Sequence, residues 1–530
     1  MTFYQDIIDL ILSEDIDSKE TLHKRKMKLC KKYGLKKIPA NSEILAHIPQ
    51  SYSEEKQQRL IKILRKKPMR TISGVAIVAV MTSPAVCPHG QCIPCPGGPS
   101  FDSPQSYTGH EPAAMRASLH GFDPYKQVSG RLKQLRLIGH NIDKIDLIIM
   151  GGTFPARSAY YQQWFVKRCY DALNKKESSS LKQAKKRNET ADHRCIGLTV
   201  ETRPDWFRLR QADDALQFGA TRVELGVQTV FDDLLFKINR GHTVSDSIAA
   251  TRIGKDAGFK MCYHLMPGLP GADEKRDVDS FHTVFNNPCF KPDMIKIYPT
   301  IVVKGTKLYD DWKNGSYVPL NTKEATKLLA KLVDMVPEWV RIQRIQRDVP
   351  SPYIDAGVQM SNLRQLVDKA IFDRNLNNND IRFRELGHMM LKNKIEIDNI
   401  DVSIHKQRYT ASESTEIFLS LISKKYNALI GYLRLRDINQ SHRYELQKNP
   451  CMIIRELKIV GQELAIGDKN KVGFQHKGFG STLIEEAEKT CTEEFDKQML
   501  FVLSGVGVKE YYRTYHGFKD VGMYLRKNLQ

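Results

Sequence analysis

The sequence has no apolar run long enough to cross a bilayer. Its longest, Gly74–Met81, is far shorter than the roughly 20 residues that a transmembrane helix needs. Asp6 and Asp9 interrupt the apolar N-terminus, where a secretory signal would require an uncharged stretch. The 10 cysteines are an ordinary number for 530 residues, and seven of them are scattered singly along the chain. We therefore expect a cytoplasmic protein without a membrane span and without a disulfide framework.

Acidic residues are in short supply. There are 61 of them against 81 lysines and arginines, which gives a net charge of +20. Residues 19–70 alone hold 16 basic and four acidic residues. Such a field favours a polyanionic partner, most commonly nucleic acid, although a solvated basic surface explains it equally well. Residues 1–70 are predicted to form a basic helical module, in which Ser18 or Asp17 caps a helix that ends near Gly34.

A chain of this length indicates two to four domains. From residue 71 to about 300, β-rich segments alternate with helical ones, a pattern typical of repeated βα units in a parallel sheet or barrel. Sites in such folds collect beyond the carboxyl ends of the strands. The predicted strands are Gly74–Met81, Lys144–Met150, Cys195–Val200, Arg222–Val227, Phe259–His264 and Met294–Tyr298.

The rest of the chain is predicted to hold a connector and a second α/β domain. Residues 301–383 are expected to form a helical connector, with Lys323–Val336 as its clearest helix. Residues 384–530 are expected to form a second catalytic domain. Its predicted elements are a hairpin of Ser414–Ile422 and Leu429–Leu435, a strand at Cys451–Val460, a helix from Gly478, a strand at Met499–Ser504 and a short helix holding Tyr511 and Tyr512.

Three of the cysteines are clustered. Cys87, Cys92 and Cys95 form the spacing C-x4-C-x2-C directly after the first predicted strand. Glycine and proline between them favour a tight loop, so the three thiolates can point at one centre. A structural zinc normally takes four ligands, and His89 could supply the fourth. A [4Fe–4S] cluster with one open iron fits the three cysteines better.

The cysteine loop resembles that of radical S-adenosylmethionine (SAM) enzymes. Those enzymes carry C-x3-C-x2-C after the first strand of a partial (βα)6 barrel, and this chain has one extra residue. The resemblance implies that an electron from the cluster cleaves SAM to a 5'-deoxyadenosyl radical. It also implies SAM contacts at the ends of later strands, namely Gly151, Gly152, Glu201, Glu224, Gln228 and Lys296. Each of these could instead be a satisfied polar group at the barrel mouth.

The C-terminal domain resembles the GNAT acetyltransferase fold. Gln475–Gly480 joins a loop to a helix, where glycines let backbone N–H groups and the helix N-terminus bind a pyrophosphate. A loop of this type alone is a weak signal, and its weight comes from the neighbouring strands. The resemblance implies that acetyl-CoA contacts Arg455, Glu456, Leu457, Lys458, Gln475, Gly478, Phe479, Gly480 and Tyr511, with Tyr511 or Tyr512 near the thioester.

The two modules together resemble the family of Elongator catalytic subunits, over residues 71–525. The matching motifs are Cys87–His89, Cys95–Pro99, Gln105–Gly109, Met150–Phe154, Ile345–Pro350, Gln475–Gly480 and Ser504–Gly507.

The family resemblance implies an activity and its partners. The deoxyadenosyl radical would remove hydrogen from the methyl group of acetyl-CoA, and the carbon radical would add to carbon five of the tRNA wobble uridine. Thioester hydrolysis would then leave a carboxymethyl group. Lys144 corresponds to a lysine that contacts acetyl-CoA, and we include it with Tyr511 and Tyr512 as catalytic. The resemblance is also compatible with a homodimer and with Elongator-type subunits.

Two departures and one alternative remain. The first cysteine loop is shorter than in eukaryotic members. Asn378–Arg384 contains no cysteine, so the zinc of some relatives is not predicted. The alternative function is a protein lysine acetyltransferase with a structural iron–sulfur or zinc module. A tRNA-binding scaffold with decayed sites is a further alternative, which the intact cysteines and glycine loop oppose.

Overall fold

The computed structural model describes residues 2–13, 16, 18–65, 74–393 (of 391–393 the backbone only), 401–448, 450–460 and 478–529. Gln475 therefore lies outside the described residues. Their helices are α1 Phe3–Ser13, α2 Lys19–Lys32, α3 Asn41–Ala46, α4 Glu54–Leu64, α5 Pro112–Leu119, α6 Pro124–Leu137, α7 Ala159–Asn174, α8 Leu181–Asn188, α9 Leu209–Phe218, α10 Asp232–Lys237, α11 Val244–Asp256, α12 Glu274–Asn286, α13 Lys307–Lys313, α14 Thr322–Asp334, α15 Leu363–Asp373, α16 Ile381–Arg384, α17 Leu386–Asn393, α18 Tyr444–Gln447, α19 Phe479–Lys489 and α20 Lys509–His516.

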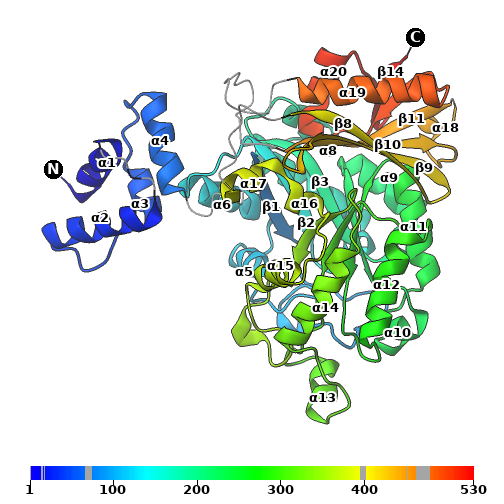
Figure 1. Ribbon diagram of the computed structural model, residues 1–530, viewed down its shortest axis with the longest axis horizontal. Helices are drawn as coiled ribbons and strands as arrows, with labels where there is room; N and C mark the ends of the chain where they lie inside the picture. The colour runs from blue at the N-terminus through cyan, green and yellow to red at the C-terminus, as the bar shows by residue number, and fades with distance from the viewer. Residues whose placement is uncertain are drawn as a thin grey trace.

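The described strands form two seven-stranded sheets (Figure 1). The first contains β1 Val75–Met81, β2 Lys144–Met150, β3 Arg194–Thr202, β4 Arg222–Gln228, β5 Lys260–Leu265, β6 Met294–Ile297 and β7 Arg341–Ile345. The second contains β8 Ser403–Ala411, β9 Ser414–Ser423, β10 Ala428–Ile438, β11 Cys451–Ile459, β12 Met499–Val502, β13 Lys519–Val521 and β14 Tyr524–Asn528.

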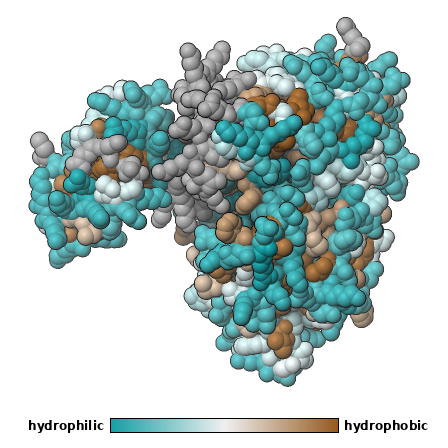
Figure 2. Space-filling view, viewed as in Figure 1, coloured by the Kyte–Doolittle hydropathy of each residue, from teal (hydrophilic) through white to brown (hydrophobic). Residues whose placement is uncertain are grey.

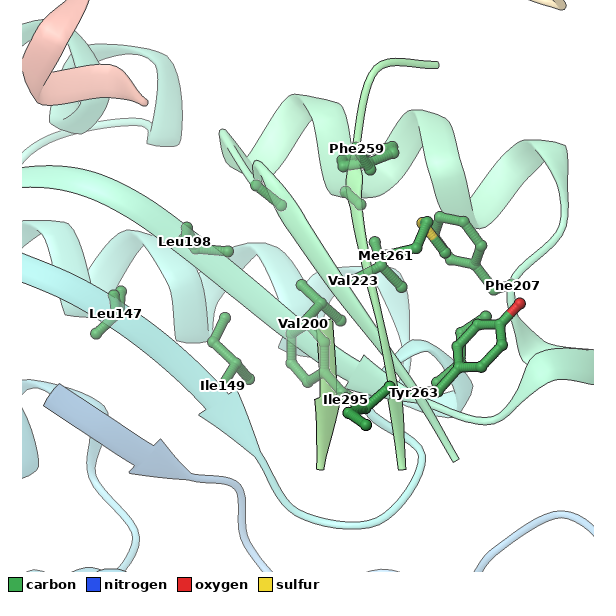
Figure 3. Close-up of a cluster of buried hydrophobic side chains, with 14 of the residues drawn as sticks. Leu147, Ile149, Leu198, Val200, Phe207, Val223, Phe259, Met261, Tyr263 and Ile295 are labelled. Atoms are coloured by element: carbon green, nitrogen blue, oxygen red, sulfur yellow. The ribbon is translucent and has the colours of Figure 1, made fainter. Parts of the chain in front are cut away.

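The first sheet is a half-barrel in which all neighbouring strands run parallel, in the order β1 to β7. Alternate residues of each strand face outward and inward. Leu147 and Ile149 of β2 lie in the buried cluster against the outer helices, together with Leu198 and Val200 of β3 (Figure 3). Asp146 and Ile148, which alternate with the first two along β2, line an internal cavity instead. The inner face of the half-barrel therefore carries both polar and apolar side chains and is open to a ligand.

The six predicted strands are confirmed, but the prediction of a purely helical connector over 301–383 is wrong. This segment contains α13, α14 and α15, yet it also contributes β7, which pairs with β6 as the seventh strand of the sheet. The sequence of β7, Arg-Ile-Gln-Arg-Ile, does not read as a core strand, because its inner positions are polar. Arg341 and Gln343 line the cavity while Ile342 is buried.

The second sheet is mixed and lies between α19 and the half-barrel. Its order is β13-β14-β12-β11-β10-β9-β8, with β11 and β12 parallel. Leu433 and Leu435 of β10 pack in the cluster that contains α19. Arg434 and Arg436 alternate with them and are buried against the half-barrel, where they pair with Asp293 and Asp256. The interface between the domains is thus built from ion pairs as well as apolar contacts.

Close backbone packing explains the glycines of the Ser504–Gly507 motif. A Cβ atom on Gly505 would lie 2.0 Å from the carbonyl oxygen of Ile196 in β3. A Cβ atom on Gly507 would lie 2.5 Å from Cβ of Arg194. Side chains here would force the two domains apart, so these glycines set how closely the second domain approaches the half-barrel.

Helices α1 to α4 form the predicted N-terminal module, which projects from the half-barrel in Figure 1. Phe3, Ile7 and Ile8 of α1 are buried in its own small core. Ser18 caps α2 by accepting a hydrogen bond from the Thr21 amide. Figure 2 shows an outer surface dominated by hydrophilic residues. Among the described residues, no helix is both long and apolar enough to span a membrane.

Candidate active site

A cavity of about 1040 Å³ joins the cysteine loop to the second sheet. It occupies the inner face of the half-barrel, and residues from both domains form its wall. Many of the predicted site residues line it, namely Cys87, Cys92, Cys95, Gly152, Glu201, Gln228, Lys296, Arg455, Glu456, Leu457, Lys458 and Tyr512. The structure therefore brings the two sets of candidates together, although β11 begins 356 positions after Cys95 in the chain.

The three cysteines lie beyond the carboxyl end of β1, where the fold predicts a site. All three are buried. Cys92 Sγ lies 3.0 Å from His89 Nε2, and Cys95 Sγ lies 3.1 Å from Ser106 Oγ. The Cys87 Sγ atom is 3.6 Å from Thr153 Oγ1. Burial raises the pKa of the Cys92 thiol, and the nearby Arg240 guanidinium opposes that rise.

The spacing of the three sulfurs bears on the zinc alternative. Ligand sulfurs of one tetrahedral zinc lie about 3.8 Å apart, because each Zn–S bond is about 2.3 Å. Among the described residues, the cysteines do not form a group whose sulfur atoms all lie within 4.8 Å of one another. A wider arrangement suits a cluster in which each cysteine binds a different iron.

A buried charge cluster lies on the inner face of β3 to β6. Lys296 Nζ lies 3.2 Å from Glu201 Oε1 and also contacts Glu224. His264 Nε2 is 3.0 Å from Glu224 Oε2. Burial alone would raise the pKa of Glu224, but Lys296, His264 and Arg222 together outweigh it and hold that pKa well below its usual value. Glu224 is thus an ionised partner of Lys296, and Glu224 does not itself line the cavity.

Gln228 ends β4 with a positive φ of 71°, and its Oε1 atom has no hydrogen-bond partner among the described residues. Because buried carbonyl oxygens are normally paired, this atom is placed to accept from a ligand in the cavity. Gly151 follows β2, and a Cβ atom there would lie 2.3 Å from Thr82 Oγ1. Gly151 therefore supports the turn that presents Gly152 to the cavity.

Strand β11 separates from β12 halfway along its length. It pairs with β12 only over Cys451–Ile454, whereas it pairs with β10 as far as Ile459. The register between β10 and β11 shifts at Arg434/Leu435, which places a bulge at Arg455. Bulges of this kind are frequent next to active sites. The main chain from Arg455 to Lys458 thus has an edge with no β12 partner, facing the cavity.

The Arg455 side chain is occupied by ion pairs. Its Nη2 lies 2.6 Å from both Asp293 Oδ1 and Glu416 Oε2. The three side chains are fully buried between the two domains. Arg455 would therefore contact a ligand through its main chain.

Tyr511 and Tyr512 lie on α20 but occupy different places. Tyr512 is buried and lines the cavity, and burial raises its pKa well above the usual value. Tyr511 lies against the start of α19, where a Cβ atom on Gly480 would be 2.7 Å from its hydroxyl. Gly478, Phe479 and Gly480 lie at this helix start, outside the cavity lining, as does Tyr511.

Lys144 is the first residue of β2, half-buried, at the end of the half-barrel that faces the second domain. Its register partners are Val75 and Arg194, and Arg194 packs on Gly507. It is not among the residues that line the cavity. No sequence pattern around it indicates a role.

Sequence reasoning missed several residues that hold the site. Arg240 Nη1 lies 3.7 Å from Cys92 Sγ, and Gln105 Nε2 lies 3.4 Å from Cys95 Sγ. Glu385 and His388 also line the cavity, from the start of the segment that is predicted to form the second domain. The sequence indicates the Gln105–Gly109 motif only through the family resemblance. In the structure, the contact between Gln105 and Cys95 shows that this motif supports the cysteine loop.

Comparison with known proteins agrees with this architecture. Three family models match the chain, namely the ELP3 N-terminal domain over residues 1–72, the radical SAM superfamily over 85–283 and the radical SAM C-terminal domain over 292–372. The tRNA uridine(34) acetyltransferase of Methanocaldococcus jannaschii is 49% identical over 99% of this chain and 97% of its own length. The chain belongs to this family.

The family also includes eukaryotic members. Elongator complex protein 3 of Schizosaccharomyces pombe is 40% identical over 99% of this chain and 97% of its own length. A solved structure of archaeal Methanocaldococcus infernus Elp3, with residues 1–46 deleted, superposes with a TM-score of 0.77. It is 44% identical and covers 87% of this chain and 100% of that one. The radical SAM half-barrel with a second, mixed sheet is thus the fold of the tRNA uridine(34) acetyltransferase family.

Proposed function

We propose that the protein modifies the wobble uridine of tRNA, using SAM and acetyl-CoA to install a carboxymethyl group at carbon five. The observation that carries this proposal is one cavity that is lined by the three cysteines at one end and, at the other, by the edge of β11 that has no β12 partner. Two chemistries that must act on one acetyl group need such a shared, enclosed space. Membership of the tRNA uridine(34) acetyltransferase family identifies the enzyme as a transferase and supports tRNA as the substrate.

Cys87, Cys92 and Cys95 would hold a [4Fe–4S] cluster. The fit rests on three buried thiols around one end of the cavity, with donors from Arg240 and Gln105 aimed at two of the sulfurs. Such donors stabilise the negative charge of thiolate ligands. When bound, the cluster would supply the electron that cleaves the sulfonium bond of SAM.

The remaining polar groups at this end would bind SAM. Gln228 Oε1, which has no partner among the described residues, would accept a hydrogen bond from SAM. Gly152 leaves room for SAM beside it. Lys296 keeps Glu201 in place, and Glu201 also accepts a hydrogen bond of 2.9 Å from the Tyr107 hydroxyl. Glu224 also contacts Lys296 and orients its ammonium group.

The second sheet would bind acetyl-CoA. The pantetheine amides would pair with the free edge of Arg455–Lys458, and the pyrophosphate would lie at the start of α19 near Gly478 and Gly480. This arrangement directs the acyl group toward the cavity, where Tyr512 lies. Lys144, Tyr511 and Gln475 complete the proposed set of contacts.

We expect carbon label from the acetyl methyl group to enter tRNA only when SAM is present. The experiment uses the anaerobically reconstituted holoenzyme with dithionite, methyl-labelled acetyl-CoA and bulk tRNA, followed by digestion and mass spectrometry of nucleosides. Label in a carboxymethyl-type uridine that depends on SAM supports the proposal. Labelled acetyl-lysine on protein, regardless of SAM and without a labelled nucleoside, would instead support the lysine acetyltransferase.

The N-terminal module would bind the tRNA backbone. Lys24, Lys28 and Lys31 follow the i, i+4, i+7 spacing on α2 and are exposed, so they share one face. Lys26 of the same helix is buried and donates to Asn41 Oδ1 at 3.0 Å, which removes it from this surface. Each phosphate contact contributes about 0.7 to 0.9 to the slope of log K against log salt.

Changing Lys24, Lys28 and Lys31 to glutamate is expected to weaken tRNA binding and to reduce its salt slope by about 2 to 3. Filter binding over a series of salt concentrations measures this slope. The matched control changes Lys323, Lys327 and Lys331, which are exposed on α14. Equal effects of the two triple changes would show only an effect of net charge.

A further inference from the structure

Glu385 and His388 form a pair on the cavity wall, at the start of α17. The i, i+3 spacing places both on one face of the helix. His388 Nε2 lies 3.2 Å from Glu385 Oε2. Their side chains are 11% and 5% exposed, respectively, and both line the cavity. A histidine oriented by a carboxylate inside a ligand cavity is a recurring form of general base.

The carboxylate of Glu385 stays ionised. Burial alone would raise its pKa, but Arg341 and Lys458 outweigh burial and hold the pKa well below its usual value. Arg341 Nη2 donates to Glu385 Oε2 at 3.3 Å, and Lys458 Nζ lies 3.7 Å from Glu385 Oε1. We assign the His388 proton to Nε2, because an ionised carboxylate can only accept. The lone pair is then on Nδ1, which has no partner among the described residues.

The pair lies beside the expected position of the thioester. Lys458, which contacts Glu385, belongs to the β11 edge that has no β12 partner. Glu385 itself forms an isolated parallel bridge to Leu429 of β10, the neighbour of β11. His388 is therefore within the cavity at the end where the second sheet presents the acyl group.

Other ionisable groups at this end are less suited to accept a proton. Arg434 Nε donates to Glu456 Oε2 at 2.8 Å. Burial raises the pKa of Glu456, but Arg434, Lys260 and Lys458 together lower it below its usual value. Tyr512 keeps its proton because burial raises its pKa well above the usual value. Burial also lowers the pKa of Lys458, but its amino group lies 3.7 Å from the ionised Glu385, which favours the protonated form that cannot accept a proton.

We propose that His388 is the general base for hydrolysis of the thioester, and that Glu385 is its positioning residue. This inference rests on the proposed function. Water adds to the thioester carbonyl carbon while its proton passes to His388 Nδ1. The C–S bond then breaks, the CoA thiolate leaves and takes a proton back from the imidazolium, and the acyl group is released as a carboxylate with its proton passing to solvent.

The expected result for His388→Gln is a loss of about 10²-fold or more in the rate of CoA thiol release, with the affinity for acetyl-CoA unchanged. The assay uses the reconstituted holoenzyme with SAM and tRNA at several concentrations of acetyl-CoA. We expect the loss to fall on kcat and to leave KM for acetyl-CoA unchanged, because the imidazole acts on the attacking water and not on the bound cofactor.

The matched control is His405→Gln. His405 also lies near a glutamate, with 3.9 Å between its Nε2 and Glu338 Oε2, but it is 46% exposed and outside the cavity lining. Glu385→Asp keeps the charge that faces Arg341 and withdraws it from His388, so it should also slow hydrolysis in a folded protein. Full activity of His388→Gln, or a loss that falls on KM for acetyl-CoA alone, would overturn the inference. No thiol release by the wild type would overturn the proposed function itself.

Discussion

Replacing Asp293 by alanine is expected to destabilise the protein by about 3–5 kcal/mol, the cost typical of removing one partner from a buried ion pair. Asp293 immediately precedes β6, and its carboxylate accepts from Arg455 at 2.6 and 2.8 Å. It also accepts from the Met261 amide at 2.8 Å. Without the Asp293 carboxylate, Glu416 is the only carboxylate partner left to Arg455 in the described network. Lys255 loses one of its two carboxylate partners.

The control for this prediction is Asp192→Ala. Asp192 is 78% exposed and pairs at 2.9 Å with Lys175, which is 54% exposed. Exposed pairs contribute about 0–1 kcal/mol. Denaturant unfolding followed by circular dichroism compares the two variants. Because Asp293 lies in the half-barrel and Arg455 in the second sheet, we expect the Asp293 variant to unfold in two separated steps. Equal stability of the two variants would contradict the role assigned to the network.

Acid should weaken the same interface. Burial alone would raise the pKa of Asp293, but Arg455 and Lys255 outweigh it, and the pKa is well below its usual value. The pKa of Glu416 is also lowered, by Arg455 and Lys255 against burial. Carboxyl groups with lowered pKa values stabilise the fold above their unfolded values, about 3.9 and 4.3, and lose that contribution as the pH falls further. Stability is therefore expected to decline below about pH 4, as unfolding measured over a pH series would show.

The sequence was sufficient to predict the parts of the fold that follow local patterns. Strands β1 to β6 are apolar runs between turns, and the cysteine loop has its own spacing. β7 was missed because the inner positions of an open half-barrel carry arginine and glutamine. The alternation of leucine with Arg434 and Arg436 in β10 also resembles a solvent-exposed face, although both arginines are buried.

The site was predictable only where a motif is local. Arg455 was predicted as a cofactor contact from its position in β11, but its guanidinium pairs with Asp293, 162 residues away. Glu385 and His388 carry no usable signal, because a glutamate three residues before a histidine is common in any helix. Only the packing of α17 beside β10 places them in the cavity. The SAM and acetyl-CoA contacts themselves stay predictions.

Replacing Cys92 by serine is expected to abolish the SAM-dependent label in tRNA while acetyl-CoA still binds. Serine is nearly isosteric with cysteine, so the loop should keep its fold, but a hydroxyl is a poor ligand for iron. The loop lies at the opposite end of the cavity from β11, so the acetyl-CoA site should be unaffected. Iron content and the electron paramagnetic resonance signal of the reduced protein report the cluster, and calorimetry reports acetyl-CoA binding.

Cys289→Ser is the matched control, since the other nine cysteines are buried and Cys289 is only partly so. A Cys92 variant that still labels uridine would contradict the radical chemistry, and one that loses acetyl-CoA binding would show that the two ends of the cavity are not independent.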